Sequence, residues 1–281
     1  MKKHFGSLVA LGLLFAGLSF AGPSTAAAQE QPGGVTPPPK VLVIMREFLK
    51  PGKAGTLHQK SESAFVQAFT NAKWPEHYLG MDSLSGKSRA LFIAGYDSFD
   101  AWQKDVDAVQ KNATLAAALD SAQAADGELL TSYESSTWTY REDYSVRAPV
   151  KIGDMRYMEI NHFRIRAGHR QDWDALVKMY VSAYEKIADA HWATFEEMYG
   201  TDSGGSYIVV TPMKSLAEVD KAQADEKQFM SSTGADQMKK MADLSAATIE
   251  WSESNVFMIN PKMSYPTDTW VKADPAFWGQ K

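Results

Sequence analysis

The chain has 281 residues, of which 44% are hydrophobic and 22% are charged, and this composition is that of an ordinary globular protein. It carries 29 Lys and Arg against 34 Asp and Glu, which gives a formal net charge of −5. Because there is no basic excess to neutralise phosphates, we expect neither a nucleic acid nor an anionic membrane as a partner. The absence of cysteine excludes disulfides, thiolate metal sites and cysteine nucleophiles.

The N-terminal residues have the pattern of a secretory signal peptide. Lys2 and Lys3 precede the apolar run Leu8–Phe20, which is followed by small residues, so residues 1–28 are expected to be removed on export to the periplasm or beyond. The apolar run is shorter than the roughly 20 residues of a transmembrane helix, and we expect no membrane association after its removal. Residues 29–40 are rich in Pro and Gly and are expected to form an unstructured spacer.

The next part of the chain predicts an alternation of strands and helices. A β-branched, apolar strand is expected over residues 41–48, followed by a helix over 54–69. A hairpin with its second strand at 90–94 comes next. An Ala-rich helix over 112–125 and a last strand over 130–140 complete this part.

The same order of elements then occurs a second time. A strand over 157–165 precedes a helix over 170–186, whose apolar side chains recur at the spacing of one helical face. The second strand of a hairpin is expected at 207–211, an Ala-rich helix at 235–247 and a last strand at 248–259. The chain therefore predicts the α+β class, with two tandem βαββαβ, ferredoxin-like units.

Two junctions in the chain resemble those of a known family. Residues 48–53, FLKPGK, are similar to the strand-to-helix junction of NIPSNAP-type domains, and residues 163–169, FRIRAGH, are a looser version with Ala in place of Pro. These domains belong to the dimeric α/β-barrel superfamily, in which two ferredoxin-like sheets close face to face. The resemblance covers residues 41–262 and implies an intramolecular pseudo-dimeric α/β barrel. Its units are residues 41–145 and 155–262.

The superfamily contains proteins of several activities, and no motif of this chain selects one of them. It includes cofactor-free quinone-forming monooxygenases, haem-degrading enzymes and chlorite dismutases, so haem is a cofactor that the resemblance allows and no motif requires. The chain has no phosphate-binding glycine loop and no nucleophile elbow. His58 and Glu62 lie one helical turn apart and could share a metal ion, but such pairs arise often by chance, and we expect no metal site.

The strand over 157–165 carries polar residues on both of its faces. Alternation places Glu159 and Asn161 on one face and His162 and Arg164 on the other. These groups either satisfy one another across the barrel or converge in a cavity, where His162 could act as an acid, a base or a haem ligand.

Two further sets of residues are candidates for a cavity. One carboxylate of the pair Glu196 and Glu197 must point inward and needs a partner such as Arg46 or Arg164. Aromatic side chains on the strands are typical of a core, but they also suit a flat apolar ligand. The candidate cavity-lining residues are Arg46, His77, Glu159, Asn161, His162, Arg164, Glu196 and Tyr207.

Three functions remain open from the sequence. The first is an exported protein that binds a small apolar or aromatic ligand in a barrel or sheet–helix cavity. The second is an enzyme, either a cofactor-free monooxygenase or a haem-dependent oxidoreductase with His162 or His77 in the active role. The third is a structural or interaction module, for which the aromatic C-terminal residues 263–281 would form the contact. Otherwise we expect these residues to form an extended tail over the barrel surface.

Overall fold

The computed structural model describes residues 35–201 and 204–280. The predicted signal peptide and the first residues of the predicted spacer lie outside this part of the chain. No helix among the described residues combines the length and the apolar composition needed to cross a membrane.

Strands and helices alternate in the order that the sequence predicts. The first half contains β1 (Val41–Leu49), α1 (Thr56–Ala72), β2 (Tyr78–Ser83), β3 (Arg89–Tyr96), α2 (Phe99–Lys111), α3 (Ala113–Gly127) and β4 (Leu130–Val146). A short 3-10 turn, η1 (Ile152–Asp154), leads into the second half. That half contains β5 (Tyr157–Ile165), α4 (Arg170–Tyr184), β6 (Trp192–Tyr199), β7 (Ser206–Met213), α5 (Ala217–Ser232), α6 (Ala235–Thr248) and β8 (Ile249–Ile259).

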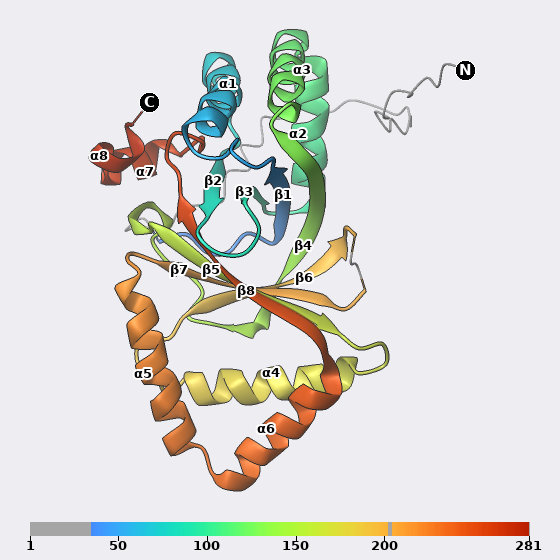
Figure 1. Cartoon of the computed structure of the whole chain (residues 1–281), viewed down its shortest axis with the longest axis vertical. Helices are drawn as coiled ribbons and strands as arrows, with labels where there is room; N and C mark the ends of the chain where they lie inside the picture. The colour runs from blue at the N-terminus through green and yellow to red at the C-terminus, as the bar shows by residue number, and fades with distance from the viewer. Residues whose placement is uncertain (1–34, 202–203, 281) are drawn as a thin grey trace.

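The eight strands form one closed antiparallel barrel. Their order around it is β1-β3-β2-β8-β5-β7-β6-β4, so the two halves join at β2–β8 and at β4–β6. The second junction explains why β4 is longer than the sequence predicts, because its last residues pair with β6. Helices α1, α2 and α3 lie on one side of the barrel and α4, α5 and α6 on the other (Figure 1).

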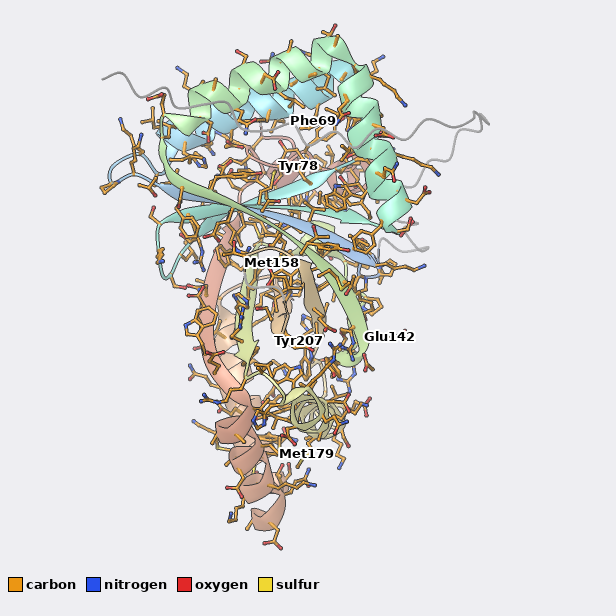
Figure 2. The ribbon with its side chains drawn as sticks, turned by 90° about the vertical axis from the view of Figure 1, so that its right-hand side faces the viewer. Phe69, Tyr78, Glu142, Met158, Met179 and Tyr207 are labelled. Carbon is orange, nitrogen blue, oxygen red and sulfur yellow. The ribbon has the colours of Figure 1, made fainter. Side chains whose placement is uncertain are left out.

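The barrel interior is a packed apolar core. Strand alternation directs every second side chain inward, and the inward set includes Ile44, Leu91, Trp138, Met158 and Phe257. The indole of Trp138 is 0% exposed. A second apolar layer, which contains Tyr207, lies between the barrel and α4 (Figure 2). The barrel core and the helical layers are therefore separate clusters.

The described part of the predicted spacer is ordered against the barrel, which corrects the expectation of an unstructured segment. Thr36 and Val150 exchange two backbone hydrogen bonds, with N–O distances of 2.7 and 3.3 Å. The prolines 37–39 line the mouth of the barrel. Prolines lack an N–H to satisfy and present an apolar ring, so they suit a segment laid over an apolar opening.

The C-terminal residues contain two short helices, α7 (Asp268–Ala273) and α8 (Pro275–Trp278), and the expectation of an extended tail is wrong. The Thr267 hydroxyl accepts a hydrogen bond from the N–H of Trp270, and Asp274 caps α8. The indole of Trp278 is 2% exposed and donates to the carbonyl of Gly153 at 2.8 Å. The aromatic side chains that could have formed a partner contact are therefore packed against their own chain.

Candidate functional site

The largest cavity lies between the outer face of the second-half strands and helices α4, α5 and α6. Its volume is about 830 Å³, which is in the range of small-molecule sites. One wall is aromatic and is formed by Phe163, Trp173, Tyr180, Tyr184 and Trp192. We call this space the helix–sheet cavity.

Two of the predicted site residues form a polar patch on the wall of the helix–sheet cavity. Glu159 and Asn161 lie on its strand side, and the Asn161 amide donates to Glu159 Oε1 at 3.0 Å. Ser254 Oγ donates in turn to Asn161 Oδ1 at 2.5 Å. The predicted alternation is observed, because Met158 and Ile160 face the barrel core instead. The cavity thus combines aromatic side chains with the Glu159–Asn161 pair, and charged residues of α5 such as Lys221, Asp225 and Glu226 also line it.

The tyrosines of the cavity are hydrogen-bond donors at neutral pH. Burial raises the pKa of Tyr144 to about 12, and it also raises the pKa of Tyr180 and Tyr184. The Tyr144 hydroxyl donates to Asp174 Oδ1 at 3.0 Å. These phenols therefore present neutral, amphipathic surfaces to a ligand.

Helix α5 covers one side of the helix–sheet cavity and is held by a single buried side chain. That side chain is Phe229, which stacks on Tyr180 and Tyr184 with ring centroids 5.7 and 5.2 Å apart. In Figure 1 the helix runs past one end of α4 at a steep angle. Its residues nearer the N-terminus, such as Lys221 and Ala222, line the cavity.

A second cavity, of about 300 Å³, lies at the mouth of the barrel. Its walls are mostly apolar and include Leu42, Phe195 and Trp270, and His77 and Glu76 lie among them. The His77 ring stacks on Tyr265 with centroids 4.8 Å apart. The predicted residue His77 lines this cavity and does not line the helix–sheet cavity.

Glu76 at the barrel mouth titrates near neutrality. Burial, together with the charges of Asp105 and Asp97, raises the pKa of Glu76 from its ordinary value of 4.5 to about 7. Folding therefore favours the protonated carboxyl. The stability that this preference contributes is fully present below pH 4.5 and is lost as the pH rises to about 7.

Replacing Glu76 by Gln is expected to remove this pH dependence. Between pH 4.5 and 8 the wild-type protein should lose about 1 kcal/mol more stability than Glu76→Gln, after a discount for the half-exposed position of the side chain. Urea unfolding at both pH values measures the difference, with Glu185→Gln at an exposed site as the control for the substitution. Equal pH slopes for Glu76→Gln and the wild type would contradict the assignment.

Arg46 and His162 line the same small space inside the barrel, which has a volume of about 20 Å³ and holds no more than a water molecule. Arg46 Nη1 donates to Ser136 Oγ at 2.8 Å, and burial lowers the pKa of Arg46. The His162 ring packs edge-on to Trp138 and Trp251, with centroids 5.6 and 5.0 Å apart. This arrangement is a packed polar contact with no room for a substrate.

The other predicted site residues lie outside the helix–sheet cavity and outside the cavity at the barrel mouth. Glu196 faces outward, where Arg141 and Arg170 each bind its carboxylate at 2.7 Å. Its neighbour Glu197 is the buried member of the pair, and its charge acts on Arg46, as the alternation predicts.

Arg164 lies in an open hollow at one end of the barrel, together with Glu250 and Trp251. Tyr207 is buried in the layer beneath α4, in contact with Tyr144 and Trp173. The eight predicted residues are therefore distributed over several places, and only Glu159 and Asn161 share the largest cavity.

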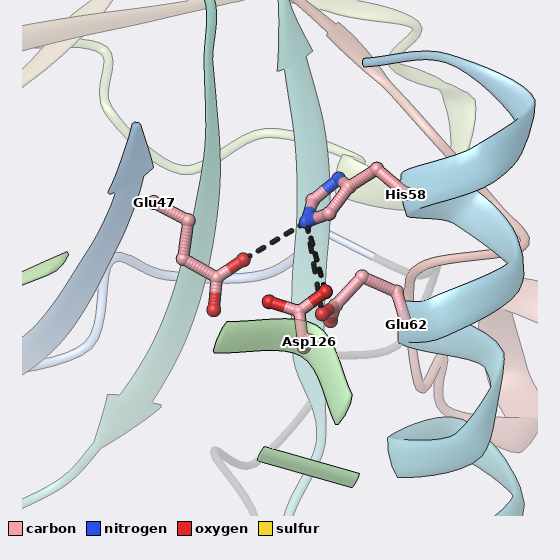
Figure 3. A group of neighbouring side chains, drawn as sticks. All are labelled: Glu47, His58, Glu62 and Asp126. Carbon is pink, nitrogen blue, oxygen red and sulfur yellow. Dashed lines mark hydrogen bonds and ion pairs between the residues drawn. The ribbon is translucent and has the colours of Figure 1, made fainter. Parts of the chain in front are cut away.

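A cluster of four ionisable side chains lies in the first half, between β1, α1 and α3 (Figure 3). Its members are Glu47, His58, Glu62 and Asp126, and we call it the Glu–His cluster. The sequence indicated the pair His58 and Glu62, but it did not indicate that Glu47 and Asp126 join them. Glu47 could have been noticed as a charged residue at the end of an otherwise apolar strand. No feature of the sequence around Asp126, at the end of an Ala-rich helix, points to this role.

Comparisons with known proteins identify the fold. No family model matches the chain, and no curated protein matches its sequence. A candidate monooxygenase from Fusobacterium nucleatum has a similar structure, with a TM-score of 0.51 and 9% identity over 79% of this chain and 93% of that protein. A candidate monooxygenase from Lactobacillus acidophilus gives a TM-score of 0.48 at 6% identity, over 78% and 94% of the two chains. Chlorite dismutase from Candidatus Nitrospira defluvii gives 0.45 at 8%, over 84% and 95%.

The protein therefore has the architecture of the dimeric α/β-barrel proteins, an eight-stranded closed barrel with helices outside it. At these levels of identity the likeness concerns the fold, and the chemistry has to be argued from the cavities of this chain.

Proposed function

We propose that the protein binds a small, largely apolar or aromatic molecule in the helix–sheet cavity. The observation that carries the proposal is the combination of about 830 Å³ of space, several aromatic lining residues and the hydrogen-bonded pair Glu159–Asn161 on the strand side. Apolar walls supply the binding energy, and a few fixed polar groups orient the ligand. A flat molecule with one or two oxygen substituents fits this chemistry.

The organisation of the barrel supports the proposal of two tandem ferredoxin-like units, residues 41–145 and 155–262. In the first half β1 pairs with β3 and β4, and in the second half β5 pairs with β7 and β8. Strands β2 and β3 form a hairpin, as do β6 and β7. The NIPSNAP-like junctions and export through residues 1–28 belong to the same proposal, and mass measurement of the exported protein tests the cleavage.

A haem ligated by histidine does not fit the helix–sheet cavity. The one histidine that lines this cavity in the described structure is His191. Its Nδ1 lies 2.8 Å from the carbonyl of Asp189, and its Nε2 lies 2.8 Å from that of Pro212. Both ring nitrogens are thus occupied by the backbone. Of the two histidines proposed for an active role from the sequence, His162 is in a space of about 20 Å³, and His77 lines the other cavity, at the barrel mouth, where its ring stacks on Tyr265.

Ligand binding is tested with two probes, the fluorescent anilinonaphthalene sulfonate and the quinone menadione. We expect both to bind the wild-type protein, and menadione to displace the fluorescent probe. Ala222→Trp places an indole in the cavity from α5 and should weaken both affinities at least tenfold, whereas Gln228→Trp on the same helix lies outside the cavity lining and should leave them unchanged. Equal affinities in the two variants would place the probes elsewhere, and no binding to the wild type would refute the proposal.

Oxidation of the bound ligand is a second candidate function, favoured by the position of Glu159. Its carboxylate is held by Asn161 on the cavity wall, where it could accept a proton from a phenolic substrate. The test is oxygen uptake with 1,4-dihydroxynaphthalene, which O₂ oxidises to the quinone with formation of H₂O₂. Uptake above the protein-free rate that falls at least tenfold in Glu159→Gln would support an oxidase. Uptake equal to the protein-free rate would rule out oxidation of this substrate and leave ligand binding as the proposed function.

A further inference from the structure

The Glu–His cluster is a set of ligand atoms without a cation. His58 Nε2 lies 3.1 Å from Glu47 Oε2, 3.6 Å from Asp126 Oδ1 and 3.8 Å from Glu62 Oε1 (Figure 3). One ligand atom from each of the four side chains lies within 4.8 Å of every other. In a tetrahedral site with metal–ligand distances near 2.1 Å, neighbouring ligand atoms are about 3.4 Å apart. The three distances from the imidazole bracket this value.

The cluster is buried and its hydrogen bonds are incomplete. His58 is 0% exposed and Asp126 is 2% exposed. Nδ1 of His58 has no hydrogen-bond partner among the described residues, and the carboxyl groups of Glu62 and Asp126 face each other, where a hydrogen bond forms only if one of them keeps a proton. Buried polar atoms of a native protein are almost always satisfied, by protein, water or an ion. A buried imidazole nitrogen without a partner and two carboxyl groups in contact therefore point to a bound ligand.

The missing partner is a cation, because the cluster has an excess of acidic groups. Three carboxyl groups surround one imidazole, and in the described part of the chain no Arg or Lys forms an ion pair with any of them. Burying several carboxylates without a cationic partner is costly, and a divalent ion bound between them would offset their charge.

We propose that Glu47, His58, Glu62 and Asp126 bind a divalent transition-metal ion, Zn²⁺ or Mn²⁺. One imidazole with three carboxylates suits these ions, whereas Ca²⁺ and Mg²⁺ prefer all-oxygen sites with more ligands. For Zn²⁺ the four buried protein ligands complete a tetrahedral site, which is the character of a structural site. The buried hydroxyl of Tyr78, which has no hydrogen-bond partner among the described atoms and lies within electrostatic range of Glu62, is placed to support a ligand carboxylate.

The ion would link three elements of the first half. Its ligands come from β1, from α1 and from the C-terminal end of α3, so it would fasten two helices to the barrel wall. The chain has no cysteine and hence no disulfide to do this. Binding to the folded protein alone raises its stability in proportion to the logarithm of the ion concentration.

The test measures metal binding and thermal stability together. The full-length mature protein is prepared without a histidine tag, stripped with EDTA and titrated with ZnCl₂ or MnCl₂ by calorimetry. We expect one ion per chain and an increase of several degrees in Tm with saturating metal. Glu62→Gln should weaken binding at least a hundredfold, whereas His169→Gln, at the exposed His169–Asp172 pair, should bind as the wild type does.

Glu62→Gln also separates metal binding from a failure to fold. It replaces a buried carboxyl by a neutral group of the same shape, so the metal-free variant should unfold at a Tm equal to or above that of metal-free wild type. Added metal should then raise the Tm of the wild type and leave that of the variant unchanged. The proposal is overturned if the wild type binds neither ion at 100 µM, a concentration about a hundredfold above a micromolar Kd, or if the variant binds it equally well.

Discussion

Replacing Trp138 by Ala is expected to lower the free energy of unfolding by about 3–5 kcal/mol, the range measured for large aromatic residues in cores. The indole is 0% exposed, lies inside the barrel and donates to Ser136 Oγ at 2.8 Å. It also carries the Arg46 guanidinium 5.8 Å above its ring. The substitution would therefore leave a cavity. It would also remove the ring that lies against the buried Arg46 guanidinium, which would keep only its hydrogen bond to the Ser136 hydroxyl.

Trp251 provides a matched control for this substitution. Both indoles pack edge-on to His162, but Trp251 is 44% exposed. Trp251→Ala should therefore cost about 1 kcal/mol or less. Urea denaturation followed by circular dichroism measures both variants under the same conditions. If the two losses were equal, the barrel interior would not be the stabilising core described here.

Gly80→Ala is the second substitution with a large expected effect, about 3 kcal/mol, at the upper end of the range for overpacking. A Cβ at this position in β2 would lie 2.4 Å from the carbonyl oxygen of Met263 and 2.7 Å from its carbonyl carbon. Both atoms belong to the backbone, so the contact can be relieved only if the chain after β8 moves away. We expect α7 and α8 to detach from the barrel mouth.

Limited proteolysis and mass spectrometry detect this detachment as faster cleavage between residues 263 and 280. Gly127→Ala is the control, since a Cβ there meets no atom within 4 Å, and it should be neutral or slightly stabilising. Unchanged cleavage in Gly80→Ala would show that the tail is not docked on β2. Neither substitution changes a residue of the tail itself, so a difference in cleavage reports the contact between β2 and Met263.

Local pattern predicted the elements and the faces of the strands well. The period of two along β5 was enough to separate Glu159 and Asn161 from Met158 and Ile160. The reason is physical, because every residue of a paired strand must point to one of two sides. The barrel closure came from the family resemblance, since the pairings β2–β8 and β4–β6 join residues far apart in the chain.

The sites could not be predicted to the same extent, because they depend on distances between elements. The Glu–His cluster forms only because the end of α3 lies next to α1, and the spacing of residues along the sequence does not show that these two helices are neighbours. Arg46 and His162 were predicted to be polar groups in the barrel, but the size of the space around them is decided by neighbouring indoles. The tail was expected to be extended, whereas it contains two short helices, and Pro275 occupies the first turn of α8, where its missing N–H has no cost.

The two junctions that close the barrel are unequal, and this has a consequence for its motions. The β2–β8 junction consists of three residue pairs, from Met81–Ile259 to Ser83–Phe257, whereas β4–β6 extends from Thr137–Tyr199 to Val146–Trp192. A closed sheet opens first where the fewest backbone hydrogen bonds must break. Amide hydrogen exchange should therefore be faster at β2 and at the end of β8 than along β4. The barrel would then open transiently at the β2–β8 junction, while the longer β4–β6 pairing keeps the two halves in register.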